Sequence, residues 1–156
     1  MKPEVEKQLQ SVLDTRDKQR QEAATLAANR QSNEAKNLAD FAAKKDEVIR
    51  PAFEEIVKIY KARNLPIRIQ EKDETQNSKG GTEAPVIALD LAPNTYNATM
   101  KPQFQFTFDK RNRELSLYTS TSSQAGPGPK IALDAVSIDW IHEAFVKYET
   151  KGSLLF

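Results

Sequence analysis

Residues 4–50 contain neither glycine nor proline, and the first glycine of the chain is Gly80. Alanine, glutamate, lysine, glutamine, leucine and arginine dominate this stretch, and these residues lose little conformational freedom on entering a helix. After Pro66 apolar and polar residues alternate, with proline, glycine and asparagine between the runs. The sequence therefore predicts a helical arm, residues 1–45, followed by a sheet-containing domain, residues 46–156.

The arm is compatible with one helix or with two. A single helix over residues 3–45 would be about 65 Å long at 1.5 Å per residue. The segment Asn29–Asn33 contains the poorest helix formers of the arm, and Ser32 there is suited to capping a second helix. The pattern leaves both a continuous helix and an antiparallel helical hairpin open.

Apolar residues of the arm recur at helical spacing. An isolated helix is marginal in water, so such a stripe predicts burial against a partner, either a second copy or another protein, through residues 3–45. Arginine, glutamine and alanine at many seam positions make a poor coiled-coil seam, although a homo-oligomer remains an option. The candidate partner-binding residues of the arm are Val5, Leu9, Val12, Leu26, Leu38 and Phe41.

Pro51 interrupts the helical pattern, because proline removes a backbone donor and clashes with the preceding turn. The proline either kinks the helix or sits in the first turn of a separate helix over residues 47–63. We expect a kink or break there, followed by a helix over residues 50–63 that ends by Leu65, before Pro66.

Alternating apolar residues predict four or five mainly antiparallel strands, with a tight turn at residues 109–112. We expect a polar loop over residues 73–84 and a Gly-Pro-rich loop over residues 124–129. A final helix, capped by Ser137 and ended by Gly152, precedes an apolar tail that docks on the core or on a partner. The apolar strand residues are Ile67, Ile69, Ile87, Leu89, Leu91, Phe104, Phe106, Phe108, Leu115, Leu117, Ile131 and Leu133, and the tail residues are Leu154, Leu155 and Phe156.

These elements predict an α+β fold in which the 50–63 helix and the C-terminal helix cover one face of the sheet. Alternation leaves the opposite face polar, either simply solvated or used for docking. Arg68, Gln105 and Tyr118 are its candidate partner-binding residues, because tyrosine and arginine are frequent anchors of interfaces.

The composition excludes several classes of function. The chain has no cysteine, so disulfides, thiolate metal sites and cysteine nucleophiles are absent. Its 23 basic and 22 acidic residues give a net charge of +1, so the basic footprint of a general nucleic-acid binder is missing. We expect neither a signal peptide nor a membrane span, and a cytoplasmic location.

Signals of catalysis are weak. His142 is the only histidine, and Asp139 and Glu143 are near it in sequence, but no nucleophile or third metal ligand accompanies them. The run Lys79-Gly80-Gly81-Thr82 lacks the spacing of a phosphate-binding loop. We therefore expect no enzyme activity, cofactor or metal.

The expected function is that of a non-enzymatic protein-protein interaction or assembly factor, adaptor-like or chaperone-like, acting through the arm and the polar sheet face. The alternative is nucleic-acid binding by the same surfaces. A small enzyme that uses His142 is a third reading, and it requires a ligand pocket beside that residue.

Overall fold

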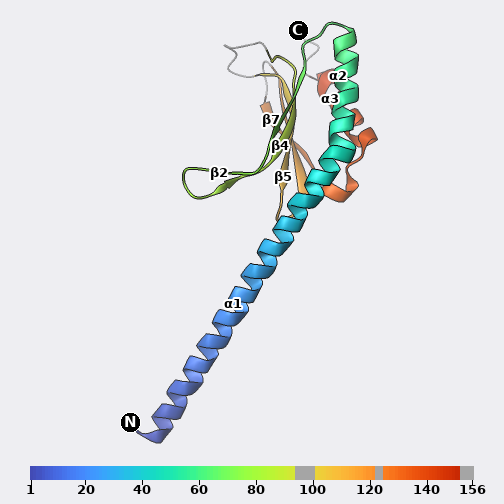
Figure 1. Ribbon diagram of the computed structural model, residues 1–156. Coiled ribbons are helices and arrows are strands. Elements are labelled where there is room, and N and C mark those ends of the chain that lie inside the picture. Colours follow the sequence, from blue (N-terminus) through green and yellow to red (C-terminus); the bar gives the residue numbers. More distant parts are fainter. Residues whose placement is uncertain (94–100, 122–124, 152–156) are drawn as a thin grey trace. The chain divides into compact units, whose positions relative to one another are not determined.

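The computed structural model describes residues 1–93, 101–121 and 125–151 of the 156-residue chain (Figure 1). It divides into two compact units, residues 1–36 and residues 37–156. The predicted α+β fold is confirmed: a long N-terminal helix, a five-stranded antiparallel sheet and a C-terminal helix follow one another. Gly152 and the tail Leu154–Phe156 lie outside the described residues.

Helix α1 spans Pro3–Lys44 without interruption, so the arm is one helix and the hairpin alternative is wrong. The poor helix formers at residues 29–33 each cost less than about 1 kcal/mol in a helix, and no glycine or proline is present to add a larger penalty. Residues 3–36 of α1 make up the helix of the first unit, and its last residues belong to the second.

Just before Pro51, where the sequence predicts a kink or break, the α-helix gives way to a wider helical turn. A π-helical turn, η1, spans Lys45–Ile49, and α2 follows directly over Arg50–Ala62. The Arg50 N–H donates to the carbonyl of Lys45, five residues earlier. Pro51 then occupies the first turn of α2, where its missing donor costs least, so the chain stays helical.

The large sheet has the strand order β1-β4-β5-β6-β7, with all neighbours antiparallel. The hairpin predicted around residues 109–112 is confirmed as the β5–β6 connection. The strands are β1 Arg68–Lys72, β4 Val86–Asp90, β5 Gln103–Asp109, β6 Glu114–Ser120 and β7 Ala125–Ala132.

The predicted Gly-Pro-rich loop at residues 124–129 is wrong, because β7 begins at Ala125. β7 is an edge strand, a position that tolerates Pro127 and Pro129. Its register with β6 shifts so that Gly128 and Pro129 together face Leu117 in a β-bulge. A Cβ atom on Gly128 would lie 3.2 Å from the Leu117 carbonyl oxygen, so glycine permits this close approach.

The predicted polar loop at residues 73–84 also contains paired strands. β2, Thr75–Gln76, and β3, Thr82–Glu83, form a small separate hairpin. The Asn77 side-chain oxygen accepts hydrogen bonds from the backbone N–H groups of Lys79 and Gly81, at 3.0 and 2.9 Å. Sequence patterning does not reveal these strands because they are short and exposed on both faces.

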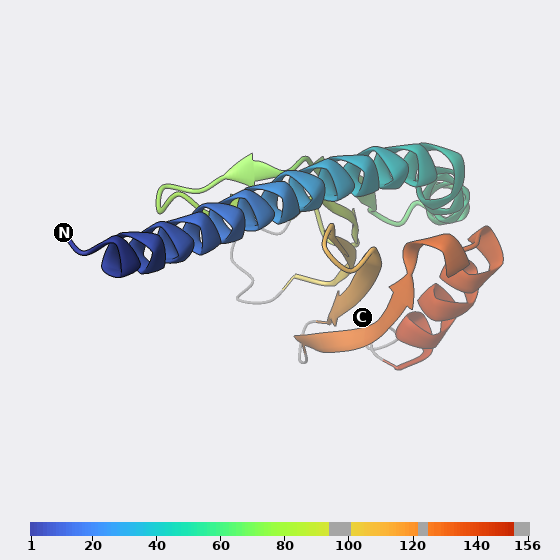
Figure 2. The ribbon, with the colours of Figure 1, turned by 90° about the horizontal axis from the view of Figure 1, so that it is seen from below.

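The C-terminal segment packs as a helix on the sheet. A 3₁₀ turn, η2, occupies Leu133–Ala135, so the strand ends at Ala132 and does not continue through Leu133 as the alternation predicts. Helix α3 spans Ile138–Lys151 and lies alongside β7 (Figure 2). The predicted cap is confirmed, since the Ser137 hydroxyl accepts the N–H of Trp140 at 3.1 Å.

Three phenylalanines of β5 organise the core under the helices. Phe108 stacks on Phe41 of α1 with ring centroids 4.6 Å apart. Phe106 stacks on Phe53 of α2 at 6.0 Å. Phe104 meets α3 in an edge contact at 5.3 Å with Phe145. One face of the sheet is thus covered by helices, as the sequence predicts.

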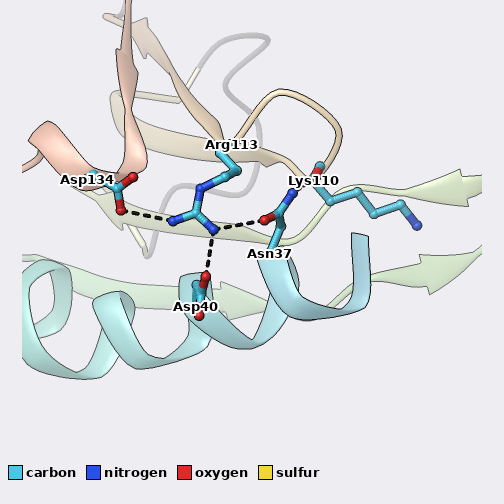
Figure 3. A network of polar contacts seen from close by, with 5 residues as sticks. All are labelled: Asn37, Asp40, Lys110, Arg113 and Asp134. Atoms are coloured by element: carbon cyan, nitrogen blue, oxygen red, sulfur yellow. Dashed lines mark hydrogen bonds and ion pairs between the residues drawn. The ribbon is translucent and has the colours of Figure 1, made fainter. Parts of the chain in front are cut away.

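A polar network fastens the end of α1 to the β5–β6 hairpin (Figure 3). Arg113, held at a left-handed φ of 53°, donates to Asn37 at 2.8 Å, to Asp40 at 2.6 Å and to Asp134 at 2.9 Å. The buried Asn37 amide also donates to the Lys110 carbonyl at 2.8 Å. Burial of Asn37 is compensated because both ends of its amide are hydrogen-bonded.

We predict that Phe53→Ala lowers the free energy of unfolding by about 3–5 kcal/mol, because it leaves a cavity between α2 and the sheet. Urea denaturation followed by circular dichroism measures this loss. The matched control is Ile59→Ala on the exposed side of the same helix, with an expected change within about 0.5 kcal/mol. Equal losses for the two variants would contradict the described packing of α2.

Candidate interaction surfaces

The first surface is an apolar stripe on the arm. We define the arm stripe as Val5, Leu9, Val12 and Leu26, whose side chains are 46–67% exposed. Every residue from 1 to 33 is exposed. Between Val12 and Leu26, the same side of the helix carries the polar residues Arg16 and Gln19.

The other two arm candidates have a structural role. Phe41 is 3% exposed and stacks on Phe108, while Leu38 is partly buried against the same core. Both residues belong to the second unit, so they contribute to its stability. Helical periodicity alone does not distinguish a stripe that meets the chain's own sheet from one that meets a partner.

The second surface is the sheet face opposite the helices. The strand register places Gln70, Ala88, Gln105 and Tyr118 side by side across β1, β4, β5 and β6. Gln105 and Tyr118 are therefore direct neighbours, and Tyr118 is 39% exposed. Arg68 lies on the same face in the adjacent row, opposite Asp90. The structure brings Gln105 and Tyr118 together and sets Arg68 two strands away from Gln105.

Asp90 is a buried carboxylate on this face that the sequence pattern does not single out. It is only 1% exposed. Its oxygens accept hydrogen bonds from the Gln70 amide at 3.3 Å and from the Ala92 N–H at 3.1 Å, and Arg68 lies 3.7 Å away. These contacts offset the cost of burying the charge. The Arg68 guanidinium is consequently paired in part with Asp90 of the same chain.

The third surface is a groove between α2 and α3. It encloses about 500 Å³. Ile59 and Val146 on its walls are each 61% exposed. The acidic side chains of Glu55 and Glu149 also line it. The full lining is Glu55, Ile56, Ile59, Tyr60, His142, Phe145, Val146, Glu149 and Thr150.

His142 contributes to this groove and is held by α2. Its Nε2 atom lies 3.1 Å from the carbonyl oxygen of Ala52 and 3.3 Å from a carboxylate oxygen of Glu55. A carbonyl oxygen only accepts hydrogen bonds, so Nε2 carries the proton. This nitrogen is therefore a donor to α2, which favours a structural role for it over general-base chemistry. The contacting carboxylate, Glu55, is distant in sequence and was missed by local spacing.

Tyr60, which lines the same groove, has a raised phenol pKa. Burial raises the pKa of its phenol above the ordinary value, and a hydrogen bond to Glu149 raises the pKa further. Burial also raises the pKa of Tyr148, whose hydroxyl donates to the Ser120 carbonyl at 2.7 Å. Both phenols stay neutral in the folded protein at pH values where free tyrosine ionises.

Comparisons of the chain with known protein families, curated proteins and solved structures found no match. Across residues 1–93, 101–121 and 125–151, no helix combines the length and apolar character needed to cross a bilayer. Within those same ranges, no group of three or more histidine, aspartate or glutamate side chains is placed to hold a metal ion.

We predict that the stability of the protein falls as the pH rises above about 10, where tyrosine ionises in the unfolded chain. The unfolded state then loses phenolic protons that the folded state retains, so proton release favours unfolding. Tyr60→Phe removes one such proton and should flatten the alkaline decline. Urea midpoints of both proteins from neutral to alkaline pH test this, and identical pH profiles would contradict the raised pKa of Tyr60.

Proposed function

We propose that the chain is a non-enzymatic interaction or assembly factor that binds protein through the arm stripe. The single observation that carries the proposal is the exposure of Val5, Leu9, Val12 and Leu26 on a unit that consists of one helix. A helix alone has no core in which to bury such residues, and burial of each is worth about 1.5–3 kcal/mol. A partner helix suits the stripe because the stripe is narrow and long.

The open sheet face supports a second contact. Gln105 and Tyr118 are adjacent there, and an exposed tyrosine next to an amide offers both apolar area and hydrogen bonds. This pairing fits a protein partner that docks on the sheet while another contact forms on the arm.

Nucleic-acid binding by the same face has less support. Arg68 lies near Asp90, and Lys72 forms an ion pair with Glu83 at 2.9 Å. Cations that are already paired release fewer counterions from a phosphate backbone, so they contribute less to binding.

The enzyme alternative requires a ligand pocket beside His142, and the groove between α2 and α3 lies beside this residue. The groove is walled mainly by apolar side chains, and the histidine nitrogen that faces α2 is a donor. This chemistry suits the docking of apolar groups better than proton abstraction.

We predict that Leu9→Lys combined with Val12→Lys abolishes assembly of the full-length protein, because it places two charges in a contact that must be apolar. Lysine is as good a helix former as leucine, so the arm stays helical. The measurement is the mass of the complexes that contain the chain, by size-exclusion chromatography with light scattering, in purified form and in native cell extract.

The matched control is Gln10→Lys combined with Gln21→Lys, on exposed positions outside the stripe. The control should assemble like the unmodified chain. The proposed function would be refuted if the unmodified chain is a monomer both in purified form and in cell extract. It would also be refuted if the chain with Leu9→Lys and Val12→Lys assembles normally.

A further inference from the structure

The arm stripe belongs to a longer series of positions spaced alternately four and three residues apart. This is the spacing of the buried seam in a two-stranded coiled coil. All positions of the series are exposed in the structure. Their occupants, in order, are Val5, Leu9, Val12, Arg16, Gln19, Ala23, Leu26 and Arg30.

Parallel pairing of two such helices would be unfavourable. In a parallel pair each seam residue faces its own copy. Arg16 would then face Arg16, and Arg30 would face Arg30, within a partly desolvated contact. Like charges in that setting repel one another and lack a compensating partner.

Antiparallel pairing matches apolar residues with one another. When Leu9 of one copy faces Leu26 of a second copy, the same register sets Val12 opposite Ala23 and Arg16 opposite Gln19. Each contact occurs twice because the pair is two-fold symmetric, which gives four apolar layers around a polar centre. A shift by seven residues in either direction sets Leu9 against Gln19 or against Asn33, so this register matches more apolar residues than either neighbouring register.

The polar residues of the seam are also compensated in this register. The Gln19 side-chain oxygen is an acceptor for the Arg16 guanidinium at the centre. Arg30 comes opposite Val5, beside the acidic first turn formed by Glu4 and Glu6 of the second copy. Opposite charges therefore meet at both ends, whereas parallel pairing would oppose Arg30 with Arg30 at one end and Arg16 with Arg16 within the seam.

We infer that the partner of the arm is a second copy of this chain, paired antiparallel with Leu9 facing Leu26. This inference rests on the proposed function and specifies its partner. The paired segment, from Val5 to Arg30, is about 39 Å long at 1.5 Å per residue. The long uninterrupted helix serves, on this basis, as a self-association element.

The natural absence of cysteine allows a direct test of orientation and register. The full-length variants Val12→Cys and Ala23→Cys each introduce one thiol into the seam. In the inferred pair, residue 12 of one copy lies opposite residue 23 of the other, near enough for a disulfide. The variants are oxidised mildly, separately and as an equal mixture, and covalent dimers are separated by non-reducing electrophoresis. Gln21→Cys, outside the seam, measures random collision.

The expected result is abundant covalent dimer in the mixture, identified as a 12–23 bond by mass spectrometry, and little in any single variant. Efficient crosslinking of Val12→Cys alone would overturn the antiparallel orientation. Crosslinking no greater than that of Gln21→Cys, with a monomer mass in sedimentation at all concentrations, would overturn self-pairing. In that last case, the proposed function would still hold if the chain forms a complex in cell extract that Leu9→Lys combined with Val12→Lys abolishes. The partner would then be a different protein.

Discussion

The second unit depends on burying the phenylalanine row of β5. Phe104, Phe106 and Phe108 all point to one side of the sheet, and each contacts an aromatic ring from a different helix. Alternation along one central strand therefore recruits α3, α2 and the end of α1 to the same face. The polar network around Arg113 adds hydrogen bonds between the hairpin and the end of α1, at Asn37 and Asp40.

Most of this architecture could be predicted from the sequence because the apolar periods are regular. The long helix follows from residues 4–50 without breakers, and the hairpin follows from two alternating strands around a polar turn. The first part of β7 was predicted as a loop because Pro127 and Pro129 are typical of loops, and only its position at the sheet edge makes them acceptable. At Pro51 the sequence predicts a kink or break, but it does not reveal that a π-helical turn precedes the proline and places it in the first turn of α2.

The candidate surfaces were predictable to different degrees. Alternation places the polar residues of the sheet on one face, but it does not reveal that Asp90 is buried beside Gln70. The contact of His142 with Ala52 and Glu55 joins residues about ninety positions apart, so no local spacing encodes it. Phe41 and Leu9 both belong to the apolar series of the predicted arm helix. Phe41 is nevertheless buried in the core while Leu9 is exposed, because tertiary contacts rather than periodicity decide burial.

The bulged, proline-bearing edge of β7 limits how copies of this protein can aggregate. An unpaired edge strand normally offers a row of N–H and C=O groups that template the addition of foreign strands. Pro127 and Pro129 supply no N–H, and the bulge at Gly128 disturbs the spacing of the remaining groups. Growth of a continuous intermolecular sheet is therefore disfavoured at this edge.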